Sequence, residues 1–192
     1  DEETEEPVLD AQFSVFDEEG NLIDQWITDG KAHAVSHLEA GKEYILKETK
    51  TPRGYQTVTD TTFTVSGEED LSLEIKEKPI LVNIQVNNVD AKTKQLIKDK
   101  DFEFTLYKDP DCIYSMAAAS SKDGSATFKD LRYGTYYIKE TKAPFGYHLS
   151  TEVKKVVIDE NVKGDTYTFD YENTPIEIIQ TGDPTNLLMI IG

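Results

Sequence analysis

Cysteine, basic residues and long apolar runs are scarce in this chain. Cys112 is the only cysteine, so no intrachain disulfide can form, and a small protein without disulfides is either cytosolic or stabilised in another way. Lys and Arg number 20 against 37 Asp and Glu, a net charge of −17. Such a chain lacks the basic surface that nucleic acids and anionic membranes attract. The plainest interpretation of the acidic excess is solubility.

Candidate metal and cofactor sites are also scarce. His33 and His37 lie four residues apart in a stretch expected to be extended, so they do not share a helical face. No Ser/His/Asp or Cys/His arrangement has a supporting context. The sequence therefore predicts no metal, no cofactor and no enzyme with turnover.

One nine-residue stretch occurs twice, and it organises the chain. Residues 47–55 read Lys-Glu-Thr-Lys-Thr-Pro-Arg-Gly-Tyr and residues 139–147 read Lys-Glu-Thr-Lys-Ala-Pro-Phe-Gly-Tyr. Seven of the nine positions are identical at an offset of 92 residues, which indicates two copies of one domain rather than a solenoid of short repeats. We predict domains at 1–78 and 79–175, followed by a tail at 176–192.

Each repeat follows a strand that aims a glutamate inward. Residues 44–48 and 136–140 alternate as half-buried strands do, and side chains two apart share a face. Glu48 and Glu140 therefore lie on the same face as the apolar side chains before them. A buried carboxylate is costly unless it is paired or neutral, so its occurrence in both copies suggests a specific role.

Short alternating segments separated by turns predict an all-β protein of two tandem Ig-like β-sandwiches. In the first copy we expect strands near Ala34 and at 71–75, with Trp26 in the core. In the second copy, Ser115 to Ser121 could form a helical turn. The first copy has no counterpart of the strand at 82–89, so it is expected to lack its first strand and to be part of a longer protein.

The repeated pattern, Tyr-x-(Leu/Ile)-x-Glu-Thr-x-x-Pro-x-Gly-Tyr, resembles the E-box of the B-type (CnaB) domains in collagen adhesins and SpaA-type pilins of Gram-positive bacteria. The resemblance covers residues 1–175 and implies a prealbumin-like sandwich. In that family a Lys on the first strand bonds covalently to an Asn on the last strand, and the E-box Glu catalyses the reaction. An apolar site favours this chemistry, because it leaves the amine neutral and keeps the Glu protonated.

The resemblance assigns roles to individual residues. In the second copy, Glu140 matches the catalytic position and Asn173 the acceptor, but the donor position holds Asn88, which cannot attack. We therefore expect no isopeptide bond there, and a hydrogen-bonded remnant of these three residues instead. In the first copy, Glu48 matches the catalytic position, Glu77 stands at the acceptor position, and the donor would precede Asp1.

The tail resembles a Leu-Pro-x-Thr-Gly sorting signal. It reads Ile-Ile-Gln-Thr-Gly at 178–182, with Ile179 in place of Pro, and an apolar run begins at Leu187. The resemblance implies cleavage by a sortase between Thr181 and Gly182 and attachment to peptidoglycan. Contact with the membrane is expected only through the start of a truncated C-terminal span.

These observations together predict stalk or spacer domains of an extracellular, cell-wall-anchored adhesin or minor pilin subunit on a Gram-positive bacterium. One alternative is a module that binds a host extracellular-matrix protein or a glycan directly. Another is an accessory domain of a secreted glycan-degrading enzyme. An exposed aromatic patch would favour the binding module, and the sequence upstream of the chain would test the accessory-domain alternative.

Overall fold

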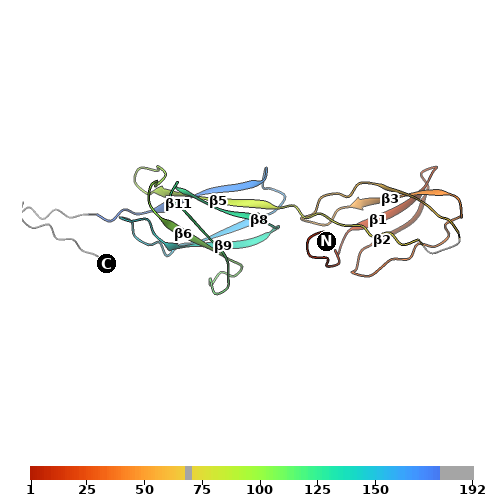
Figure 1. The fold of residues 1–192 in the computed structure, drawn as a ribbon, viewed down its shortest axis with the longest axis horizontal. Helices are drawn as coiled ribbons and strands as arrows, with labels where there is room; N and C mark the ends of the chain where they lie inside the picture. The colour runs from red at the N-terminus through yellow and green to blue at the C-terminus, as the bar shows by residue number, and fades with distance from the viewer. Residues whose placement is uncertain (68–70, 178–192) are drawn as a thin grey trace, which may run out of the picture. The chain divides into compact units, whose positions relative to one another are not determined.

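The computed structural model describes residues 1–67 and 71–177, and every regular element in these ranges is a β-strand (Figure 1). The all-β prediction is therefore confirmed. The chain divides into two compact units, Asp1–Leu81 and Val82–Gly192, close to the boundary predicted after residue 78. A search of the described residues finds no helix long and apolar enough to cross a membrane.

Unit 2, the Val82–Gly192 unit, is a sandwich of two sheets. One sheet has the strand order β10-β9-β6-β7 and the other the order β11-β5-β8 (Figure 1). The strands are β5 (Val82–Asp90), β6 (Phe102–Tyr107), β7 (Ser115–Ser121), β8 (Ser125–Leu131), β9 (Gly134–Lys142), β10 (Val153–Ile158) and β11 (Thr166–Asn173).

The alternation of apolar residues decides which face of each strand meets the core of unit 2. On β5, Val82, Ile84 and Val86 are buried, and the residues between them are only partly covered. Because side chains alternate across a strand, this pattern aims Asn88 into the same core. β11 runs parallel to β5 over its whole length, from Thr166 opposite Asn83 to Asn173 opposite Asp90.

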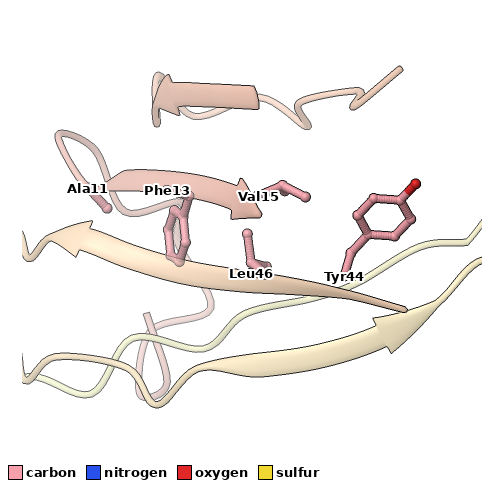
Figure 2. Close-up of a cluster of buried hydrophobic side chains, with 5 residues drawn as sticks. All are labelled: Ala11, Phe13, Val15, Tyr44 and Leu46. Atoms are coloured by element: carbon pink, nitrogen blue, oxygen red, sulfur yellow. The ribbon is translucent and has the colours of Figure 1, made fainter. Parts of the chain in front are cut away.

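Unit 1, the Asp1–Leu81 unit, contains a single four-stranded sheet of order β2-β1-β3-β4 among its described residues. Its strands are β1 (Gln12–Asp17), β2 (Leu22–Ile27), β3 (Glu43–Lys50) and β4 (Thr61–Thr64). Ala11 and two residues of β1 meet two residues of β3 in the core, as Figure 2 shows for Ala11, Phe13, Val15, Tyr44 and Leu46. Trp26 is only partly buried at the border of this core, and its ring stacks on His33.

Two strands predicted for unit 1 are wrong. Neither the stretch around Ala34 nor residues 71–75 joins a sheet, and Leu71 and Leu73 are exposed. In unit 2 the corresponding strands, β8 and β11, both pair with β5. No described strand of unit 1 occupies the place of β5, so these two segments have no ladder partner despite their alternating sequence.

The helical turn predicted at Ser115 to Ser121 is also wrong, because these residues form strand β7. Alanine favours helices intrinsically, but β6 supplies a pairing edge from Phe102 to Tyr107, and this tertiary context overrides the propensity. The signal that was missed is the repeat itself. β2 pairs with β1 in unit 1 as β7 pairs with β6 in unit 2.

Candidate functional site

The E-box glutamate of unit 2 lies in the core at the end of β9. Tyr136 and Ile138 precede it on the same face, and Glu140 is only 1% exposed. The Glu140 carboxyl thus points into the core, as the alternation of the strand predicted. A carboxylate placed there must be hydrogen-bonded or neutral.

The rest of the E-box forms a tight loop after the strand, and this loop makes a hydrogen bond to a segment that is distant in sequence. Gly146 has φ of +89° and Gly54 has φ of +86°, a left-handed conformation that glycine adopts without strain. The tyrosine that follows reaches back in each unit. The Tyr147 hydroxyl donates to Asp90 Oδ2 at 2.9 Å, and the Tyr55 hydroxyl donates to Asp1 Oδ2 at 2.7 Å.

Glu140 accepts two hydrogen bonds from groups that are distant in sequence. Asn173 Nδ2 donates to Glu140 Oε1 at 2.6 Å, and the backbone N–H of Ser150 donates to Glu140 Oε2 at 2.9 Å. Asn173 is fully buried at the end of β11. The structure thus brings the predicted catalytic and acceptor positions into direct contact.

Asn88 faces the same core but does not complete the expected network. It is 0% exposed, and neither Nδ2 nor Oδ1 of its side chain has a hydrogen-bond partner among the described residues. Asn173 Oδ1 has none either. The expected remnant of three bonded residues is therefore only half formed. Asn88 is shorter than the lysine that the family resemblance places at this position, and its side-chain amide makes no hydrogen bond to Glu140 or Asn173.

Burial favours the neutral form of Glu140. Removal from water raises the pKa of this carboxyl, and the hydrogen bonds from Ser150 and Asn173 lower it by a smaller amount. A neutral Glu140 can donate a proton to a carboxamide oxygen, which polarises the amide for attack. Lys92 and Lys94, the lysines that follow Asn88 most closely in sequence, do not supply an amine at this point, because their exposed side chains pair with Glu177 and Glu172.

Unit 1 places two carboxyl groups at the corresponding positions. Glu77 is 3% exposed, and no amide or hydroxyl group of the described residues donates to it, but its carboxyl lies within hydrogen-bond reach of Glu48. Glu48 accepts a bond from the backbone N–H of Val58 through Oε2 at 2.7 Å, and its Oε1 has no amide or hydroxyl donor. Burial and, to a smaller extent, the neighbouring Glu48 raise the pKa of Glu77 to about 7. The two carboxyl groups can coexist when they share a proton.

Both units were also found to use a backbone donor that the sequence analysis missed. The donor lies ten residues after the E-box glutamate in each case, at Val58 and at Ser150. The equal spacing in the two copies is the signal that could have identified it. In unit 2, the buried Tyr171 supports this loop, because its hydroxyl donates to the Glu152 carbonyl at 2.8 Å and accepts from Ser150 Oγ at 3.1 Å.

The remaining predicted sites have different outcomes. Thr181 and Gly182 lie outside the described residues, so the sorting signal stays a prediction. Within residues 1–67 and 71–177, no group of three or more His, Cys, Asp or Glu side chains could hold a metal ion.

The sandwich of unit 2 and the repeated E-box loop define a class, the prealbumin-like domains that carry a buried polar cluster between their terminal strands. The model of the SpaA family, the prealbumin-like fold domain, matches residues 1–79 and again residues 82–175. The chain belongs to this family, as its sequence motif predicted. No curated protein sequence matches it significantly.

The fold agrees with that of a solved structure, the first of the three described next. The Bacillus anthracis TIE protein is 26% identical with a TM-score of 0.76, and the match covers 91% of this chain and 32% of that one. A streptococcal ancillary pilin is 20% identical (TM-score 0.38, 88% of this chain and 58% of that one). The shaft pilin SpaA of Lactobacillus rhamnosus GG is 16% identical (TM-score 0.41, 91% of both chains). The chain thus spans about a third of the TIE protein and just over half of the ancillary pilin.

Proposed function

We propose that the two units are stalk domains of a surface protein anchored to the cell wall of a Gram-positive bacterium, either an adhesin or a minor pilin subunit. Their work is mechanical, because they hold a distal region away from the wall under load. The observation that carries this proposal is the parallel pairing of β5 and β11, the first and last strands of unit 2.

This pairing sets how unit 2 bears force. The chain enters at the start of β5 and leaves at the end of β11, and the two strands are in register over eight residue pairs. A pull along the chain therefore slides β5 and β11 in opposite directions. In this geometry the hydrogen bonds between the parallel strands are loaded together in shear, instead of opening one after another.

The buried polar cluster lies at the same strand ends. Asn88, Glu140 and Asn173 belong to β5, β9 and β11, and all three are at most 1% exposed. A site closed to solvent in this way suits a tie between strands and does not suit the binding of a substrate. In family members that hold a Lys at the donor position, a covalent bond would strengthen this same connection.

The partners follow from the tail and remain part of the proposal. A sortase would recognise residues 178–182 and join Thr181 to peptidoglycan, which would place unit 2 next to the wall. The names of the matched structures, a shaft pilin and an ancillary pilin, agree with a role in surface assemblies. A host matrix protein or glycan would then bind a region outside this chain.

Single-molecule force spectroscopy tests the proposal. In a C112S background, unit 2 is pulled through its own termini and, for comparison, through cysteines introduced at Thr135 and Val157. These two residues lie opposite each other near one end of the antiparallel β9–β10 pair, and neither is buried. We expect a clearly higher unfolding force when the termini are pulled. Equal forces in the two directions would refute the mechanical role.

A further inference from the structure

Strand β7 presents an open backbone edge in unit 2. It pairs with β6 on one side, and no strand among residues 82–177 pairs with its other side. An open edge of this kind exposes a row of N–H and C=O groups to which another extended strand can add.

The other edge strands of unit 2 carry charged side chains, which discourage such addition. These are Lys154 and Lys155 on β10, Lys129 and Asp130 on β8, and Asp170 and Glu172 on β11. At the corresponding place in unit 1, β2 carries Asp24. β7 differs from all of these because its residues, Ser-Met-Ala-Ala-Ala-Ser-Ser, carry no charge.

The surroundings of β7 are apolar and exposed. Ile113, Tyr114 and Met116 are 67%, 75% and 47% exposed, and the side chains of Ala117 and Ala118 are exposed as well. A register shift opposite Leu106 and Tyr107 leaves Met116 as a bulge, so the regular part of the strand is Ala117–Ser121. We name residues 113–121 the β7 edge.

We propose that the β7 edge pairs antiparallel with the β7 edge of a second copy of this chain. The side chains of Ala117–Ser121 are those of alanine and serine, which are too small to distinguish one partner's side chains from another's. An identical strand of Ala and Ser fits against them without a clash and without burying a charge. The resulting contact is two-fold symmetric, with the same surface on both copies.

Charge at the two ends of the strand selects the antiparallel direction. Asp109 and Asp111 precede β7. Lys122 and Asp123 follow it, and their charges cancel each other. A parallel pair would bring the two acidic ends together. An antiparallel pair instead separates the two acidic ends and brings each toward the Lys122 of the other copy, which is 71% exposed and lies 3.7 Å from Asp101 Oδ1 of its own copy.

The expected association is weak and depends on salt. Two five-residue segments bury much less than the roughly 1,200 Å² typical of stable complexes. The net charge of −17 on each copy also opposes the approach of two chains. Because the Debye length falls from about 10 Å at 0.1 M salt to about 3 Å at 1 M, added salt should strengthen the pairing.

Sedimentation velocity and amide NMR test the proposal on the whole chain, in a C112S background that excludes disulfide dimers. We expect a monomer–dimer equilibrium that shifts toward dimer with added NaCl, and amide shifts confined to residues 113–121 and the adjoining turns. The substitutions A118K and S120K, at two exposed positions, should together weaken association at least about tenfold, because like charges then face each other.

A matched control adds the same charge elsewhere on unit 2. Thr127 on β8 and Thr168 on β11 are exposed, and the variant T127K/T168K should still dimerise. If circular dichroism shows that A118K/S120K does not fold, S120K alone replaces it. A monomer at millimolar concentration and high salt, equal dimerisation of the β7 variant and its control, or shifts confined to another edge would each overturn the proposal.

Discussion

The pair of buried glutamates in unit 1 should make the stability of that unit depend on pH. No amide or hydroxyl group of the described residues donates to Glu77, and burial together with Glu48 raises its pKa from 4.5 to about 7. In the unfolded chain the same group titrates near its ordinary value. The folded unit therefore holds a proton that the unfolded chain releases between these two pH values.

The direction of the effect follows from this difference. Below about pH 4.5 both states are protonated and the stabilising contribution is complete. As the pH rises toward 7, only the unfolded chain ionises, so the free energy of unfolding falls. At about 1.4 kcal/mol per pH unit, the difference between 4.5 and about 7 amounts to roughly 3 kcal/mol lost by pH 8.

Trp26 provides an assay that reports on unit 1 alone. It is the only tryptophan of the chain, and its ring packs against Phe13 in the core of unit 1. Urea unfolding followed by its fluorescence, from about pH 4 to about pH 8, gives the free energy of unfolding at each pH. In the variant E77Q the side chain cannot ionise, and its amide can donate to the Glu48 oxygen that lacks an amide or hydroxyl donor.

The difference between wild type and E77Q isolates Glu77 from other titrating groups. We expect E77Q to gain about 3 kcal/mol relative to wild type between pH 4.5 and pH 8. E74Q removes the same charge from a side chain that is 83% exposed, and it should follow wild type. A difference between wild type and E77Q that does not vary with pH would refute the reasoning, as would an equal effect of E74Q.

Three further predictions concern unit 2. N88K should form a covalent bond between Nζ of the introduced lysine and the Asn173 side chain, so its mass under denaturing conditions should be lower by one ammonia, whereas wild type and N88K/E140A keep their full mass. Closing the loop between positions 88 and 173 should raise the free energy of unfolding by about 4–5 kcal/mol. E140A should lower the free energy of unfolding by about 2–4 kcal/mol in a proteolysis-coupled urea titration, because Ser150 N–H and Asn173 Nδ2 lose their acceptor; an unchanged value would contradict the geometry. G146A should cost about 1–2 kcal/mol in the same titration because φ is +89°, and a neutral result would show that the loop relaxes.

Part of the candidate site could be predicted because it depends on local patterns. The alternation before Glu140 and before Asn173 was enough to aim both side chains inward, and the repeat showed that both copies share this feature. The contact of Glu140 with Ser150 could not be predicted in this way. It joins a strand to the backbone of a loop, and a backbone donor leaves no mark on the residue type.

The errors in the predicted strands have a common physical cause. Residues 71–75 alternate as well as those of β11 do, but a strand needs a neighbour, and pairing partners are distant in sequence. The alanines of β7 show the opposite case, because β6 imposes an extended conformation on a segment with helical preference. Local pattern thus indicates which residues can form a strand, and the sheet decides which of them do.

The sequence alone determined the duplication, the all-β class and the inward glutamates. These depend on period, residue type and fixed spacing, which the chain carries locally. Only the tertiary structure decided that β5 and β11 run parallel, that Glu48 and Glu77 are buried together, and that β7 has an open edge. Each of these depends on which distant segments pack side by side, and that outcome follows from the burial of the whole core.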